Sequence, residues 1–133
     1  MIDAALTERT DMAVPEEEWR AVVGGLHNVL FEGPNGAIDV ALARLYPHLR
    51  TPTVIGRPPQ PLDMSKGCGT LIVESVDALG GIEQHRLLQW LSDGGSATRV
   101  ISATVRPLFP LVAMGRFDAM LYYRLNTMLV RVG

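Results

Sequence analysis

Short apolar segments alternate with amphipathic helical segments along most of this chain of 133 residues. Each apolar segment has the length and composition of a strand and is bounded by glycine, proline or other turn residues. Two parallel strands need a crossover that covers the sheet, so this alternation favours an α/β fold whose mostly parallel central sheet is covered on both faces. The expected strands are residues 28–31, 53–55, 70–73, 99–104 and 128–132, with 53–55 at an edge of the sheet.

Helices are expected between these strands. Pro15 followed by Glu16, Glu17 and Glu18 is typical of a helix start, because proline suits the first turn and carboxylates face the positive end of the helix dipole. A buried stripe at helical spacing predicts the next helix, and it consists of Ile38, Ala41, Leu42 and Leu45. The remaining helical segments are residues 82–91, which Gly94 and Gly95 would end, a broken piece at 108–113, and 117–125.

Length and composition indicate one globular domain. Residues 1–14 are polar and lack clear periodicity, so we expect a flexible N-terminal segment followed by a single domain at 15–133. Hydrophobic residues make up 47% of the chain and charged residues 20%, which argues against disorder over most of its length.

Charge and cysteine content exclude several kinds of function. The net charge of -2 gives no support for direct binding of nucleic acid through phosphate neutralisation. Cys68 is the only cysteine, which excludes an internal disulfide framework and fits a reducing compartment. The apolar runs are too short to span a bilayer and the N-terminus lacks the pattern of a secretory signal, so we expect a cytoplasmic protein without membrane contact.

Three segments, in the same order, resemble motifs of one family. Residues 68–75 read C-G-T-L-I-V-E-S and are similar to G-G-T-L-F-L-D-E, and residues 100–104 resemble I-A-A-T followed by asparagine. Residues 115–126, G-R-F-D-A-M-L-Y-Y-R-L-N, resemble G-R-F-R-x-D-L-Y-Y-R-L-N. These motifs belong to the ATPase domain of bacterial sigma-54-dependent transcription activators, a branch of the AAA+ ATPases. The resemblance covers residues 28–133 and implies a three-layer, P-loop NTPase-like AAA+ large subdomain.

The resemblance implies a vestigial nucleotide site at the turn after the first strand. Its residues are Gly33, Pro34, Asn35, Gly36, Ala37, Ile38 and Asp39. In a working P-loop, backbone amides cradle the phosphates and a lysine reaches the β- and γ-phosphates. With the first two glycines aligned, Ile38 stands at the last glycine and Asp39 at the lysine. A carboxylate about 4 Å from a phosphate charge costs roughly 4 kcal/mol at an effective dielectric near 20, or about a thousandfold in affinity.

Other positions of the ATPase machinery are also changed. Glu74 stands where the family has its magnesium-binding aspartate, and Ser75 replaces the glutamate that polarises water. Val105 replaces the asparagine that senses the γ-phosphate region, and it has no hydrogen-bonding side chain.

The resemblance also bears on subunit contacts. Asp118 replaces the first of the two subunit-interface arginines, so Arg124 is left of that pair, with Arg116 free for other contacts. The loop that contacts sigma-54, with its G-A-F-T-G-A signature, has no counterpart in the proline-rich segment 51–66. Because the sequence stops at Gly133, directly after the last core strand, we expect the helical lid and the DNA-binding domain to be missing.

These residues favour a degenerate AAA+ domain that acts as a non-hydrolysing interaction or regulatory module in bacterial transcription. We expect no catalytic residue and no cofactor, and a protein partner that is either a transcription component or an intact AAA+ relative. The alternative is a residual ATPase that binds ATP and magnesium with the help of Glu74 and Arg124. A cation site of Asp39, Glu74 and Asp77 at the carboxyl edge of the sheet is a further alternative, and the oligomeric state is left open.

Overall fold

The structure is a computed structural model that describes residues 14–64, 68–93 and 97–133. Five strands form one fully parallel sheet in the order β2-β3-β4-β1-β5. The strands are β1 (Val29–Glu32), β2 (Thr53–Gly56), β3 (Thr70–Val73), β4 (Arg99–Thr104) and β5 (Met128–Arg131). The expected α/β fold with a parallel central sheet is therefore confirmed, and β2 is an edge strand as expected.

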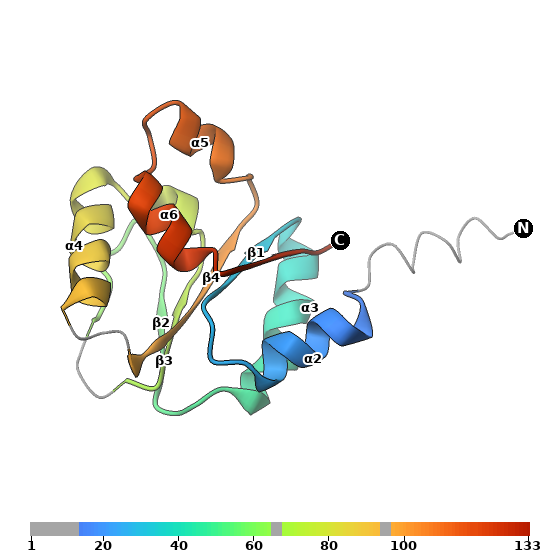
Figure 1. Cartoon of the computed structure of the whole chain (residues 1–133). Coiled ribbons are helices and arrows are strands. Elements are labelled where there is room, and N and C mark those ends of the chain that lie inside the picture. Colours follow the sequence, from blue (N-terminus) through green and yellow to red (C-terminus); the bar gives the residue numbers. More distant parts are fainter. Residues whose placement is uncertain (1–13, 65–67, 94–96) are drawn as a thin grey trace, which may run out of the picture.

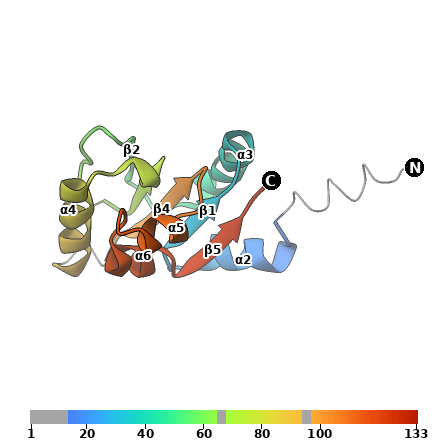
Figure 2. The same ribbon diagram turned by 90° about the horizontal axis from the view of Figure 1, so that it is seen from above.

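Helices cover both faces of the sheet (Figure 1). They are α2 (Glu16–Gly24), α3 (Asn35–Leu45), α4 (Gly81–Ser92), α5 (Phe109–Ala113) and α6 (Ala119–Leu125), with the single-turn 3-10 helices η1 (Tyr46–His48) and η2 (Val76–Ala78). α4, α5 and α6 pack on one face, and α2 and α3 pack on the other. Seen from above, α4 lies at one side of the molecule and β5 toward the other (Figure 2). The expected three-layer arrangement is confirmed.

Alternation along the strands divides the core into two halves. Leu30 of β1 points into the cluster with α4 and α6, while its neighbours Val29 and Phe31 point into the cluster with α2 and α3. All three side chains have no exposed surface. Strands buried on both faces are typical of parallel sheets, which need helices on each side.

The helix boundaries differ from expectation at two places. The helix expected from Phe117 begins at Ala119, because Asp118 serves as its N-cap and Phe117 packs into the core before it. The helix after β1 begins at Asn35, so most of the expected glycine turn is helical. The expected flexible segment 1–14, apart from its last residue, and the expected stop at Gly94 and Gly95 lie outside the described residues. Within the described parts of the chain, no helix is long and apolar enough to cross a membrane.

The central strand β4 provides a test of this core. We expect Ile101→Ala to lower the free energy of unfolding by about 2–5 kcal/mol, because it opens a cavity at a fully buried position. Ile82→Ala is the matched control, since that side chain is 79% exposed, and it should change stability by no more than about 0.5 kcal/mol. Urea unfolding followed by circular dichroism measures both, and equal losses would contradict the assignment of the core.

Candidate functional site

The carboxyl ends of the strands form the edge at which open parallel sheets bind their ligands. A hollow lies there between the start of α3, the residues after β3 and the end of β4, and we call it the carboxyl-edge hollow. Its lining residues are Asn35, Ile38, Asp39, Leu42, Glu74, Ser75, Ala103, Thr104 and Val105. The structure therefore brings four of the predicted site residues together, namely Asn35, Ile38, Asp39 and Glu74. The hollow measures about 60 Å³, whereas small-molecule sites commonly measure about 300–1,000 Å³.

The connection between β1 and α3 is short. β1 ends at Glu32 and α3 begins at Asn35, so Gly33 and Pro34 alone form the connection. Proline has no amide hydrogen, and the amide of Gly33 donates to the carbonyl of Thr104 at 3.2 Å. Ile38 already donates its amide to Pro34 at 3.0 Å as part of the first helical turn. The donors that remain at this turn are the amides of residues 35–37 at the start of α3.

Two residues of this turn have packing roles. A Cβ atom at Gly33 would lie 2.1 Å from the carbonyl oxygen of Val132, so only glycine fits beside the end of β5. Ile38 is 6% exposed and packs in the core between the sheet and α3. The position at which the family has its last P-loop glycine is thus occupied by a core side chain.

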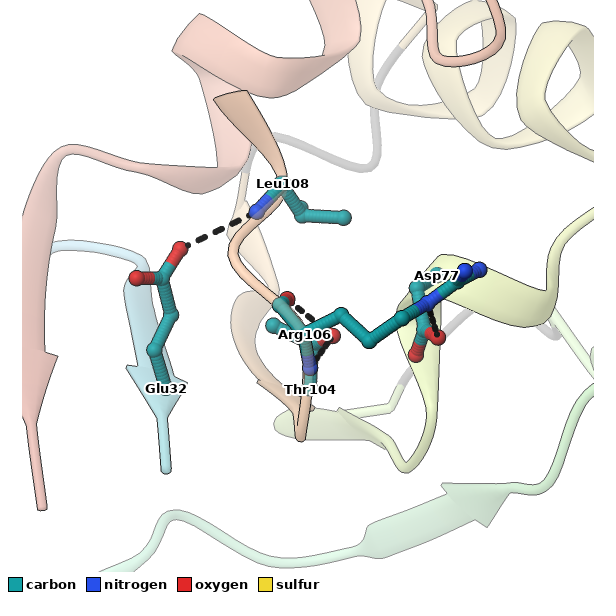
Figure 3. Close-up of polar contacts among 5 residues, drawn as sticks. All are labelled: Glu32, Asp77, Thr104, Arg106 and Leu108. Carbon is teal, nitrogen blue, oxygen red and sulfur yellow. Dashed lines mark hydrogen bonds and ion pairs between the residues drawn. The ribbon is translucent and has the colours of Figure 1, made fainter. Parts of the chain in front are cut away.

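Two carboxylates at this edge, those of Glu74 and Asp77, are held by arginines. The Glu74 carboxylate accepts a hydrogen bond from Arg57 Nε at 3.1 Å. Figure 3 shows the second contact, in which the Asp77 carboxylate accepts a hydrogen bond from Arg106 Nε at 3.2 Å. Neither Asp77 nor Arg106 lines the hollow. Among the described residues, no three His, Cys, Asp or Glu side chains come together in a way that suits a metal ion. The alternative of a cation site at Asp39, Glu74 and Asp77 therefore finds no support in the geometry.

Internal polar contacts close the neighbouring part of the same edge. The buried Glu32 carboxylate, at the end of β1, accepts a hydrogen bond from the amide of Leu108 at 3.2 Å (Figure 3). The Thr104 hydroxyl donates to the carbonyl of Arg106 at 2.7 Å and accepts from the amide of the same residue at 3.1 Å. The Glu32 carboxylate at the end of β1 and the Thr104 hydroxyl at the end of β4 thus form their hydrogen bonds with the segment that leads into α5.

The backbone after β3 changes direction at Ser75. Its φ of 53° and ψ of 51° lie in the left-handed region, and it is the one non-glycine residue with positive φ in the described chain. Few residues other than glycine, asparagine and aspartate adopt this conformation readily. Ser75 thus forms the turn into η2.

The two arginines expected at a subunit interface lie at opposite ends of α4. The carbonyl of Arg116 accepts a hydrogen bond from Gln84, near the start of α4. Arg124 donates to the carbonyl of Leu91 at 2.9 Å and to the Ser92 hydroxyl at 3.4 Å, at the end of α4. The structure does not bring these two arginines together. Arg124 is bound to its own chain, while the Arg116 side chain makes no ion pair among the described residues.

Asp118 and Gln84 have structural roles that the sequence analysis missed. The Asp118 carboxylate accepts a hydrogen bond from the amide of Leu121 at 2.9 Å and so caps α6. The side chain of Gln84 is buried, and its Oε1 accepts a hydrogen bond from the Asp118 amide at 2.8 Å. Its Nε2 donates one to the carbonyl of Leu79 at 2.9 Å. The cap could have been predicted, because aspartate directly before a helical segment is a common N-cap. No local pattern marks Gln84.

The sheet order, the two helical layers and the glycine turn after β1 define a domain of the P-loop NTPase fold. The sequence profile of the Sigma-54 interaction domain family matches residues 17–133, and the chain belongs to this family. The earlier resemblance to the family is therefore confirmed.

One curated relative is the HTH-type transcriptional regulatory protein TyrR of Enterobacter agglomerans. It is 31% identical over 107 residues, covering 68% of this chain and 20% of the relative. The chain thus spans about a fifth of the length of this relative.

Solved structures share the fold at lower sequence identity. The P-loop NTPase domain of the sigma-54 transport activator from E. coli has a TM-score of 0.69 and 18% identity, and the match covers 99% of this chain and 97% of that one. NtrX from Brucella abortus in complex with ATP has a TM-score of 0.70 and 21% identity, over 87% of this chain and 35% of that one. The RuvB Holliday junction branch migration motor of Thermotoga maritima has a TM-score of 0.61 and 16% identity, over 90% and 45%.

The two glycines of the turn should respond differently to substitution. We expect Gly33→Ala to lower the free energy of unfolding by about 1–3 kcal/mol, because its Cβ would overlap the Val132 carbonyl. Gly36→Ala is the control: nothing lies within 4 Å of its Cβ, and alanine in a helix should raise stability by up to about 1 kcal/mol. Thermal unfolding without nucleotide tests this, and a tolerated Gly33→Ala would show that the close approach is wrong.

Restoring the family's arginine at position 118 should weaken α6. We expect Asp118→Arg to cost about 0.5–2 kcal/mol in unfolding free energy, because the cap to the Leu121 amide is lost. Asp118→Asn keeps a capping oxygen and should cost less than about 0.5 kcal/mol. Chemical denaturation measures the free energy of unfolding of both variants. Equal losses in the two variants would mean that the capping hydrogen bond does not stabilise α6.

Proposed function

We propose that this chain is a degenerate sigma-54-activator-type AAA+ domain that acts as a non-hydrolysing interaction or regulatory module in transcription. The observation that carries the proposal is the start of α3 at Asn35, which leaves two residues after β1 where a P-loop needs a longer strand-to-helix loop. A triphosphate bound at this turn would find few free amides and a hollow of about 60 Å³.

Electrostatics support the same proposal. Asp39 is exposed and lines the hollow at the position of the phosphate-binding lysine. The attraction between the start of α3 and an anion is about 0.3–1 kcal/mol, which is smaller than the repulsion from a nearby carboxylate. Ser75 and Val105 line the same hollow and offer neither a general base nor an amide for the γ-phosphate.

The family and the relative suggest where such a module works. The matched family is described as a Sigma-54 interaction domain, and the relative TyrR as a transcriptional regulatory protein. We propose a protein partner in the bacterial cytoplasm, either a component of the transcription machinery or an intact AAA+ relative, and no direct contact with nucleic acid. Arg116, which is exposed, is the residue of the candidate interface that stays available to such a partner, since Arg124 is bound to α4.

Titration with nucleotide tests the proposal. We expect isothermal titration of the chain with magnesium-ATP and magnesium-ADP to give no binding heat at about 1 mM nucleotide. Asp39→Lys should gain measurable affinity, because it replaces the repulsive charge by an attractive one at an exposed position. Asp93→Lys is the matched control, since it makes the same change of net charge at the exposed end of α4 and should gain nothing.

Two results would contradict this function. Micromolar affinity of the unaltered chain for magnesium-ATP would favour a residual ATPase, and release of phosphate would establish it. Equal gains of nucleotide affinity in Asp39→Lys and Asp93→Lys would show that the added positive charge attracts the nucleotide non-specifically and that the turn after β1 is not the binding site.

A further inference from the structure

A large cleft lies at the amino edge of the sheet, opposite the carboxyl-edge hollow. It is formed by the ends of α2, η1 and α4 together with the residues that enter β1 and β4, and we call it the amino-edge cleft. Its volume is about 520 Å³, which lies within the range of about 300–1,000 Å³ for small-molecule sites. Val23, Leu49 and Leu91 contribute apolar surface to its walls.

The charged residues of this cleft have one sign. Arg50, Arg99 and Arg124 line it, and none of its described lining residues is acidic. The ends of α2 and α4 each supply a negative potential equivalent to roughly half a charge, which offsets about one of the three positive charges. A net positive potential therefore remains in the cleft.

Arg99 is a buried cation without a carboxylate partner among the described residues. It is 9% exposed, and it donates from Nε to the carbonyl of His27 at 2.7 Å and from Nη2 to that of Val22 at 2.6 Å. Burial lowers the pKa of its guanidinium, because the charged form loses contact with water. A guanidinium has five N–H donors, so these two bonds leave three donors without a partner among the described residues.

Arg124 and Arg50 add further donors to the same cleft. Arg124 uses one N–H group each of Nη1 and Nη2 for the end of α4, which leaves its Nε–H and the second N–H groups of Nη1 and Nη2. The side chain of Arg50 makes no ion pair with the described residues, and its backbone carbonyl accepts the Thr70 hydroxyl at 2.9 Å, which fixes its place in the chain. The planar forks of neighbouring arginines suit the oxygens of a phosphate or a carboxylate.

We propose that the amino-edge cleft of a single chain binds a small organic anion, with its phosphate or carboxylate group at Arg50 and Arg99 and its apolar body against Val23 and Leu49. The ligand neutralises the excess positive charge of the cleft and takes up the unused donors of Arg99. This site is separate from the turn at Gly33 and does not depend on the function proposed above.

Titration followed by NMR tests the site with three probes of similar size. Phenyl phosphate and benzoate carry the two candidate anionic groups, and benzyl alcohol is the neutral control. We expect one or both anions to shift the backbone amide signals of Leu49, Thr98 and Arg99 in ¹⁵N-labelled protein, with a dissociation constant of about 0.1–1 mM, and benzyl alcohol to shift none of them at about 10 mM. The stronger of the two anions identifies the anionic group.

Substitution of exposed arginines distinguishes binding at the amino-edge cleft from a non-specific attraction of anions to the positive charge of the protein. Arg50→Gln and Arg124→Gln should each weaken binding, Arg50→Gln by at least about tenfold, while the fold stays intact because both side chains are exposed. Arg131→Gln, at the opposite edge of the sheet, removes the same charge and should leave affinity unchanged. The proposal fails if no anion binds, if benzyl alcohol binds equally well, or if the shifts centre on residues 33–39.

Discussion

Parallel pairing of every strand is the constraint on which the rest of this structure depends. Because all five strands run in one direction, each connection has to cross a face of the sheet, and both faces become buried. Side chains that alternate along β1, such as Leu30 and Phe31, therefore serve two separate cores. The same constraint gathers every carboxyl strand end at one edge and every amino end at the other, so the molecule has two edges with different chemistry.

The carboxyl edge, where this fold holds its ligands, is here satisfied by the protein itself. Glu32 binds the amide of Leu108, Glu74 is paired with Arg57, and Thr104 closes a turn with Arg106. Each contact uses a polar group that could otherwise face a ligand or water. The Glu74–Arg57 pair is exposed and contributes only about 0–1 kcal/mol. The hydrogen bond from the Leu108 amide to the buried Glu32 carboxylate matters more, because its loss would leave a buried charged group without that partner. The apolar core thus keeps the fold of the family, and these polar groups at the carboxyl edge bind within the chain.

The sequence predicted those features that depend on local pattern. The positions of all five strands and the edge location of β2 followed from periodicity and turn residues. Of the alternative group Asp39, Glu74 and Asp77, only Asp39 and Glu74 line the same hollow. The early start of α3 was not predicted, because the glycine turn concealed that Pro34 and Asn35 can open a helix. The pairing of Glu74 with Arg57 and the burial of Arg99 could not be predicted, since they join residues from distant segments that only the tertiary fold brings together. The amino-edge cleft could not be predicted either, because segments far apart in the sequence form it.

The position of β1 within the sheet has a consequence during protein synthesis. β1 is made before the other strands, but both of its neighbours, β4 and β5, come from the last third of the chain, with Val29 facing Ile101 on one side and Met128 on the other. β2 and β3 lie close together in the sequence and become available for pairing together, whereas β1 has no strand neighbour until β4 has emerged. During that interval its apolar side chains are uncovered, and such segments are prone to aggregate and are recognised by chaperones. During synthesis β1 is thus without either of its strand neighbours until residues 99–104 have been made.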